Sequence, residues 1–213
     1  MTLRALQQHL EMLQNSGIGE IYREAKDKAA LLAKLKLQHS TCTLCPLHEG
    51  RIKFVYGEGN PDAIAMLIGE GPGEQENLSG RPFVGRAGDL LTKMLAAIEI
   101  KREDVYICSI VKCRPPGNRN PENPEREACL PYLLEQIEII QPKLIMMLGL
   151  VAAQTLLQTR QPMQELHTVT HEFMGIPSYV TYHPASLLRN ERFKYPAWDD
   201  LKRFRLDYDR YRS

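Results

Sequence analysis

The feature of this sequence that most constrains its fold is the alternation of short apolar runs with longer helical patterns beyond residue 42. Four runs rich in Val, Ile, Met and Tyr have the length of buried strands, at residues 63–68, 105–111, 144–148 and 179–182. Helical patterns separate or follow them at residues 86–98, 123–135, 149–157 and 197–207. Strands that alternate with helices predict a parallel sheet covered on both faces. We therefore predict an α/β fold, a three-layer α/β/α sandwich with a central four-stranded parallel sheet.

The first forty residues have a different pattern and predict a helical N-terminal extension, residues 1–40, ahead of a domain at residues 41–213. Leucines recur in the extension at heptad-like spacing, at Leu3, Leu6, Leu10 and Leu13. Two heptads are too few for a coiled coil. We expect the extension to pack against or cap the domain, with partner binding as the alternative.

Composition and charge exclude several classes of protein. The chain of 213 residues is 43% hydrophobic and 25% charged, as is typical of soluble globular proteins. Its longest apolar run, residues 144–153, is too short to span a bilayer, and the N-terminus lacks the apolar core of a signal peptide. We expect a monomeric cytoplasmic protein without a membrane partner. The formal net charge of +1 means that any DNA site must be a local basic patch.

The five cysteines suggest a metal site rather than disulfides, because their number is odd and the protein is expected to be cytosolic. Cys42 and Cys45 form a C-x2-C pair, and Cys113 and Cys129 follow with fifteen residues between them. Two neighbouring thiolates and two remote ones predict a four-thiolate site. Cys108 lies inside a predicted strand and is expected in the core. The spacing does not choose between zinc and a [4Fe–4S] cluster.

Polar motifs follow the predicted strands, namely GEGPGE at 69–74, Ser109 with KCRPPGNR at 112–119, and HPASLLR at 183–189. Open parallel sheets bind ligands at the carboxyl ends of their strands, so the motifs predict a single site at that edge. The glycine-rich turn lacks the GK[ST] ending of a P-loop, and Pro72 removes a backbone donor that a phosphate would use. Its acidic residues, Glu70, Glu74 and Glu76, suit a site where positive charge develops.

The motifs, in this order, resemble the family-4 uracil-DNA glycosylases. The resemblance runs from about residue 40 to residue 190 and includes GRPFVGRAG at residues 80–88. It implies a monofunctional DNA-repair glycosylase that flips uracil out of single- or double-stranded DNA and hydrolyses its N-glycosidic bond. It also implies that residues 41–213 form a uracil-DNA glycosylase-like domain with a [4Fe–4S] cluster, held by Cys42, Cys45, Cys113 and Cys129.

The resemblance also implies roles for residues of the predicted site. Glu70 would act on the sugar side, where an anion stabilises developing positive charge, and His183 would donate to uracil O2. The backbone at Gly71, the ring of Phe83 and the Ser109 side chain would contact the extruded base. A cluster that pins the loop 113–129 would present to phosphates the side chains of Lys112, Arg114 and Arg119. The HPASLLR motif would supply an apolar wedge and a phosphate contact, Leu187 and Arg189.

One residue departs from the family's pattern. Where the family presents an asparagine before KCRPP, whose amide reads the O4/N3 edge of uracil, this chain has Ser109. A hydroxyl cannot make the two simultaneous hydrogen bonds that an amide makes, so the sequence does not establish how the protein would discriminate uracil from cytosine. The alternative is a glycosylase-fold protein with shifted base specificity or a non-catalytic DNA-binding role. A second alternative is a nucleotide-binding α/β protein with a structural zinc.

Overall fold

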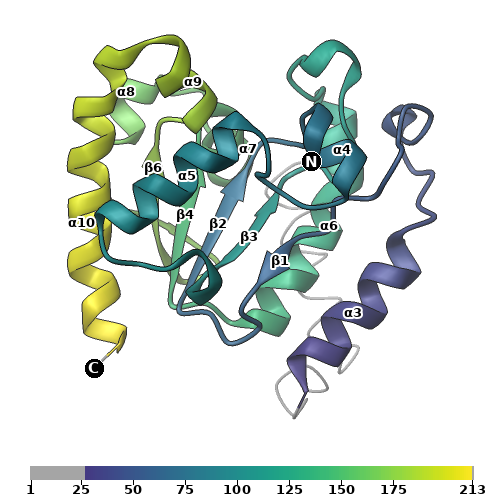
Figure 1. Ribbon diagram of the computed structural model, residues 1–213, viewed down its shortest axis with the longest axis horizontal. Coiled ribbons are helices and arrows are strands. Elements are labelled where there is room, and N and C mark those ends of the chain that lie inside the picture. The colour runs from purple at the N-terminus through teal and green to yellow at the C-terminus, as the bar shows by residue number, and fades with distance from the viewer. Residues whose placement is uncertain (1–26, 213) are drawn as a thin grey trace.

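The centre of the protein is a six-stranded sheet with the strand order β1-β3-β2-β4-β6-β5, in a computed structural model that describes residues 27–212 (Figure 1). The four central strands pair in parallel and are β3 (Tyr106–Ser109), β2 (Ala65–Gly69), β4 (Leu144–Leu148) and β6 (Ile176–Thr181). They confirm the predicted parallel centre. The sequence did not predict the short antiparallel strands at the two edges, β1 (Glu58–Gly59) and β5 (His171–Phe173).

Helices cover both faces of this sheet, as predicted. The connection from β2 to β3 contains α5 (Arg86–Ala97), and the connection from β3 to β4 crosses the sheet in the opposite direction and contains α6 (Asn123–Ile140). Because such crossovers are right-handed, the two helices lie on opposite faces, with α5 in front and α6 behind in Figure 1. The remaining α-helices of the described residues are α3 (Lys28–His39), α4 (Glu74–Ser79), α7 (Leu150–Leu157), α8 (Met163–Leu166), α9 (Pro184–Arg189) and α10 (Lys194–Arg212).

The central strands lie in a continuous apolar core because both of their faces are covered. All five residues of β2 and all five of β4 are buried, which explains their sequences AMLIG and LIMML. Cys108 of β3 is fully buried, as predicted. After β2 the chain forms β3 on one side of β2, and it then crosses back to form β4 on the other side of β2. The topological switch point therefore lies between β2 and β4. A ligand site is therefore expected at the carboxyl ends of these strands.

The described part of the predicted N-terminal extension is α3, which lies against α6. Leu32 and Leu35 belong to the same hydrophobic core as the sheet, and His39 Nε2 is 2.7 Å from the Glu135 carboxylate. The leucine repeat of the first 26 residues lies outside the described residues. Within residues 27–212, no helix is both long and apolar enough to cross a membrane.

Candidate active site

A cavity of about 380 Å³ lies at the carboxyl ends of the central strands. Predicted site residues from the ends of three strands meet there, since Glu70 follows β2, Ser109 ends β3, and His183 follows β6. The structure therefore brings the three motifs together at one edge of the sheet, as predicted. The other residues that line it are Val55, Gly71, Pro72, Gly73, Glu76, Pro82, Phe83, Ala87, Pro115, Asn118, Arg119, Asn120, Ala185, Ser186 and Arg189.

His183 is held in one tautomer by the helix that follows it. It is the N-cap of α9, and its Nδ1 accepts a hydrogen bond from the Ala185 amide at 3.1 Å. Because a backbone N–H can only donate, Nδ1 is unprotonated and the proton of the neutral ring sits on Nε2. Burial, aided by the positive charge of Arg189, lowers the pKa of His183 to about 4. At neutral pH the ring is therefore an uncharged donor through Nε2.

Phe83 lies beside this histidine and forms part of the cavity wall. The two ring centroids are 5.5 Å apart. Phe83 has a φ of 51°, in the left-handed region, and its side chain is buried. A Cβ at Gly69 would lie 2.7 Å from the ring, and a Cβ at Gly88 would lie 1.8 Å from the Phe83 carbonyl oxygen. Glycine at both positions is therefore required for this placement of the ring.

Glu76 holds the segment that carries Phe83, a role that the sequence analysis missed. Its Oε1 accepts hydrogen bonds from the Val84 and Gly85 amides at 2.8 and 3.0 Å. Its Oε2 accepts from the Gly73 amide at 3.1 Å. The carboxylate therefore ties the start of α4 to the loop before α5. A glutamate three residues after a helix N-cap is half of a capping box, so the signal was present in the sequence.

Glu70 reaches the cavity from the position directly after β2. The side chain is half-buried, and burial raises the pKa of its carboxyl group. The positive charges of Arg126 and Arg189 partly oppose this rise. The ionised carboxylate supplies negative charge at the cavity, where it could stabilise a developing cation.

Two further side chains bring polar groups to the cavity. Ser109 is buried at the end of β3 and lines the cavity, as predicted. Asn118, which the sequence analysis did not select, also lines it and has a left-handed φ of 56°. Its Oδ1 accepts a hydrogen bond from Arg114 Nε at 2.8 Å. The NH₂ group of Asn118 is therefore the part of this amide that remains for a ligand.

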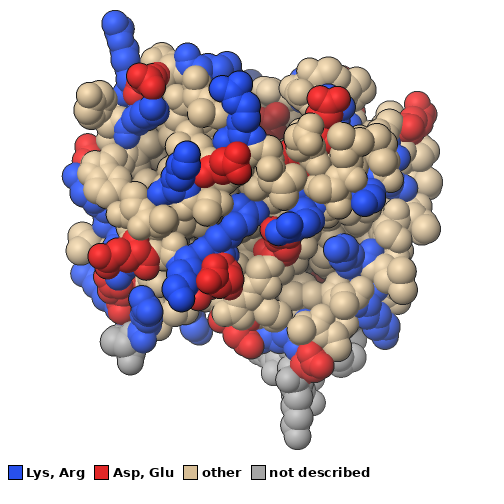
Figure 2. Space-filling view, viewed as in Figure 1, with Lys and Arg blue, Asp and Glu red and all other residues tan. Residues whose placement is uncertain are grey.

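The expected DNA-binding arginines lie at or near this cavity. Arg119 and Arg189 line it, and Arg114 Nη1 lies 3.9 Å from the Glu74 carboxylate. Arg119 also forms a two-pronged ion pair with Glu125, at 2.6 and 2.8 Å. Figure 2 shows acidic and basic side chains interspersed over the face in view. That face therefore carries no broad positive field, and a DNA contact there would depend on local arginines.

Two of the expected DNA contacts are wrong, because their side chains point into the core. Lys112 is fully buried, and its Nζ donates to the Ser109 carbonyl at 2.9 Å and to Gln136 Oε1 at 2.6 Å. It cannot reach a phosphate from there and instead holds the end of β3. Leu187 is 2% exposed, whereas the neighbouring Leu188 is 42% exposed. Of the two leucines of this motif, Leu188 is therefore the one exposed at the surface.

The four cysteines of the predicted metal site line one small cavity, Cys42, Cys45, Cys113 and Cys129. Two backbone amides donate toward their sulfurs, from Leu44 to Cys42 at 3.5 Å and from Lys112 to Cys129 at 3.3 Å. The Arg51 guanidinium donates to Cys113 at 3.5 Å. Hydrogen bonds to the sulfurs are among the features that tune iron–sulfur clusters.

This arrangement fits the donor set of a [4Fe–4S] cluster, which takes four cysteine thiolates. A zinc ion would need its donors at about 2.3 Å from one point. Within residues 27–212, no group of three or more His, Cys, Asp or Glu side chains converges closely enough to hold one metal ion. Burial raises the pKa of Cys113 and also that of Cys129, the latter to about 12. The thiolate forms would therefore depend on the positive charge of a bound metal.

Comparison with known proteins shows the family to which the chain belongs. Residues 56–202 match the family model described as the uracil DNA glycosylase superfamily. The chain belongs to this superfamily. The matched segment contains all four central strands, together with Glu70, Phe83, Ser109 and His183.

Relatives within the superfamily point to one branch of it. The type-4 uracil-DNA glycosylase of Thermotoga maritima is 48% identical over 151 residues, which cover 70% of this chain and 79% of that protein. The type-4 enzyme of Pyrobaculum aerophilum is 41% identical over 181 residues, which cover 81% and 92%. A type-5 uracil-DNA glycosylase of P. aerophilum is 31% identical over 146 residues, which cover 61% and 64%. The chain is thus a member of the type-4 family, which confirms the resemblance seen in its motifs.

Proposed function

We propose that this protein is a uracil-DNA glycosylase of base excision repair, which hydrolyses the bond between uracil and deoxyribose in DNA. The observation that carries the proposal is the fixed tautomer of His183, an uncharged donor through Nε2 in a cavity beside the Phe83 ring. A cavity of about 380 Å³ is in the size range of small-molecule sites and is adequate for one nucleobase.

Uracil reaches this cavity as an extruded base, because its glycosidic bond is inaccessible inside a duplex. The Phe83 ring supplies a flat surface for stacking, an interaction worth about 1–3 kcal/mol per base in single-strand sites. The backbone at Gly71 and the side chains of Ser109 and Asn118 contact the polar edge of the base. The bound base thereby displaces solvent from its own part of the cavity, and the sugar side stays open to the water that reacts.

Cleavage moves the electron pair of the C1′–N1 bond onto uracil and leaves positive charge on the sugar. His183 donates from Nε2 to uracil O2 as negative charge develops there. Glu70 stabilises the sugar cation and orients the water that adds to C1′. The proton that this water loses neutralises the departing uracil anion, so the products are free uracil and an abasic site with a hydroxyl group on C1′. Among residues 27–212, those that line the cavity include no lysine that could form a Schiff base with the sugar, so we expect the strand to be left uncut.

DNA is held around this site by local contacts, in single- or double-stranded form. Arg114, Arg119 and Arg189 bind phosphates, which fixes the position of the strand without reading its sequence. Leu188 enters the gap that the extruded nucleotide leaves in a duplex. Such a wedge offsets part of the unstacking cost, which is a few kcal/mol per step.

The base range of the enzyme depends on Ser109 and Asn118 together. The Ser109 hydroxyl can both donate and accept, and the Asn118 NH₂ group can donate to a carbonyl oxygen such as uracil O4. We propose that Asn118 compensates for the absence of an amide at residue 109. Ser109→Asn should then change the preference for uracil over hypoxanthine and xanthine. Equal rates and equal preferences in both proteins would contradict a role for Ser109 in base choice.

We also propose that Cys42, Cys45, Cys113 and Cys129 hold a [4Fe–4S] cluster. When bound, it supplies a rigid cross-link and negative charge, and the hydrolysis needs no redox step. The link joins the segment before η1 (Pro46–His48) to Cys113, at the start of the loop that carries Arg114 and Asn118, and to Cys129 in α6, the helix that follows this loop. Cys113→Ser should lose iron and visible absorbance, whereas Cys108→Ser, the matched control in the core, should keep both. Loss of iron from both variants, or from neither, would contradict the assignment.

The experiment that tests the proposed function is excision by anaerobically purified protein on oligonucleotides that contain uracil, hypoxanthine or xanthine. Release of uracil is expected, with alkali needed to cut the strand afterwards. His183→Asn should lower the single-turnover rate by about 10²–10³-fold, as for removal of one oxyanion donor. Excision of another base instead of uracil would establish a shifted specificity. DNA binding without excision of any base would leave the non-catalytic alternative.

A further inference from the structure

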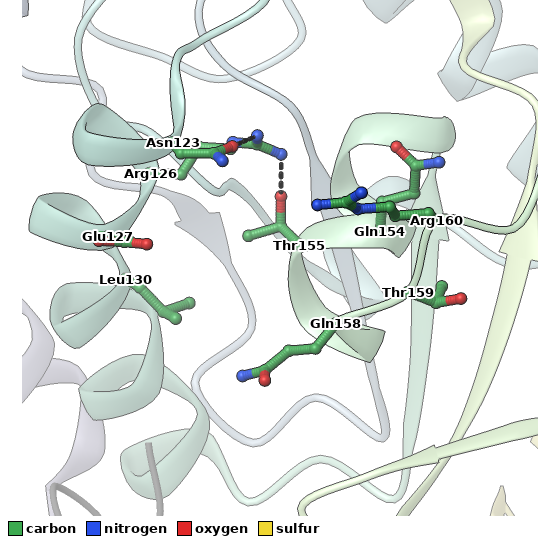
Figure 3. Close-up of a pocket in the computed structure, with 9 residues that line it drawn as sticks. All are labelled: Asn123, Arg126, Glu127, Leu130, Gln154, Thr155, Gln158, Thr159 and Arg160. Atoms are coloured by element: carbon green, nitrogen blue, oxygen red, sulfur yellow. Dashed lines mark hydrogen bonds between the residues drawn. The ribbon is translucent and has the colours of Figure 1, made fainter. Parts of the chain in front are cut away.

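A second cavity, of about 480 Å³, lies between α6 and the end of α7 and belongs to no part of the proposed mechanism (Figure 3). One wall is formed by the first two turns of α6, with Asn123, Arg126 and Leu130. The other wall is formed by α7 and the residues after it, including Thr155, Gln158 and Arg160. Its volume is within the range of ligand sites in proteins, about 300–1,000 Å³.

The cavity brings two guanidinium groups together. In Figure 3 the side chains of Arg126 and Arg160 extend toward each other from opposite walls, with Thr155 between them. Arg126 Nη1 donates to Thr155 Oγ1 at 2.9 Å, which fixes its position, while Arg160 is exposed. The lining contains one acidic side chain, Glu127, against these two arginines. Two like charges that converge in this way favour an anion between them, and arginine is well suited to phosphate.

The second cavity is next to the proposed active site. Arg119 and Asn120 line the first cavity, and Asn123, three residues later, lines the second. Burial raises the pKa of Glu70, and the positive charge of Arg126 partly opposes this rise, so that arginine is within electrostatic reach of the catalytic carboxylate. Arg126 therefore connects the two cavities, because it lines the second one while its charge acts on Glu70 in the first.

We propose that the second cavity binds one phosphate-bearing nucleotide of the substrate strand, outside the extruded uridine. Arg126 and Arg160 hold the phosphate, and the polar side chains around them, including Gln158, face the sugar or base. The proposal rests on the proposed function, because it assigns the cavity to the same DNA strand. It predicts that the protein holds a longer piece of single strand than the catalytic cavity alone could contact.

The first test uses Arg160→Gln, which removes the charge of an exposed side chain while keeping a polar group. Binding is measured by fluorescence anisotropy with single-stranded oligonucleotides that carry an uncleavable abasic-site analogue. Affinity for a long strand should fall by about 3–10-fold at low salt, and the slope of log K against log salt should decrease by about 0.7, as for the loss of one phosphate contact. Arg210→Gln, the same change near the far end of α10, is the matched control and should keep the wild-type slope.

The second test locates the contact along the strand. Single phosphates on either side of the analogue are replaced, one at a time, by neutral methylphosphonates. Wild-type protein should lose affinity at each contacted phosphate, and Arg160→Gln should become insensitive at one of them, not adjacent to the analogue. Identical profiles for the two proteins would overturn the proposal. A control measures the melting temperature of both proteins with deoxyadenosine monophosphate. If this nucleotide raises the melting temperature of wild-type protein but not of Arg160→Gln, and the methylphosphonate profiles of the two proteins are identical, the cavity serves a free nucleotide and the proposal is overturned. These measurements report DNA binding alone. Failure of this proposal can therefore be distinguished from failure of the proposed uracil excision.

Discussion

The neutral form of His183 makes a quantitative prediction for stability against pH. The folded pKa is about 4, below the value of about 6.5 for an unfolded histidine. Between these values the unfolded chain binds more protons, so this group's contribution to stability is fully present above pH 6.5 and is lost as the pH falls toward 4. At pH 5 the loss amounts to about 2 kcal/mol, from two protonation equilibria with those pKa values.

His183→Asn isolates this contribution, because asparagine is also a good N-cap and can accept the hydrogen bond from the Ala185 amide. The free energy of unfolding is measured by urea denaturation of both proteins at several pH values from 8 to 5, under anaerobic conditions. Wild-type stability should fall by about 2 kcal/mol more than that of the variant over this range. Parallel curves would refute the claim that His183 is held neutral. Nitrogen NMR of histidine-labelled protein gives an independent check, with the proton expected on Nε2 at pH 7.

Five further substitutions test other parts of the site and its surroundings. Glu76→Ala removes the acceptor of three backbone amides and should cost on the order of 2–3 kcal/mol of stability in urea denaturation, together with a lower excision rate; an unchanged midpoint would contradict its positioning role. Leu187→Ala should destabilise the fold by about 2–5 kcal/mol through the cavity that it leaves. Leu188→Ala should reduce excision from duplex DNA more than excision from single-stranded DNA. If the duplex-specific loss occurs in Leu187→Ala instead, Leu187 is the wedge. Arg189→Gln should reduce the magnitude of the slope of log K against log salt for DNA binding by about 0.7. Lys112→Met should leave that slope unchanged. A changed slope in Lys112→Met would mean that Lys112 contacts the DNA.

The central fold could be predicted from the sequence because its strands are buried on both faces. Such strands are continuous apolar runs, and 144–148 was predicted with the bounds that β4 has. The edge strands were missed because β1 has two residues and β5 has three, too few to show a period. Pairing with a neighbour, rather than local sequence, makes these segments strands.

The catalytic cavity could be placed from the sequence, but the direction of individual side chains could not. Motifs after parallel strands meet at one edge whatever their exact geometry, so Glu70, Ser109 and His183 were found. Lys112 lies after the end of β3 and Leu187 lies within α9, where a shift of one residue decides whether a side chain faces the core or the surface. Lys112 turns inward to Gln136, a partner 24 positions away that no local pattern indicates.

The two short edge strands have a consequence for association between molecules. A long unpaired strand edge offers a row of free amides and carbonyls on which another chain can add a strand. Here β1 covers part of β3 with two residues, and its Glu58 side chain is paired with Arg81 and Arg102. A strand that approached this edge would have to displace a charged cluster and would find only a short template. Detachment of β1 would instead uncover β3, so aggregation during partial unfolding should begin with this segment, and Glu58 protects solubility as well as the fold.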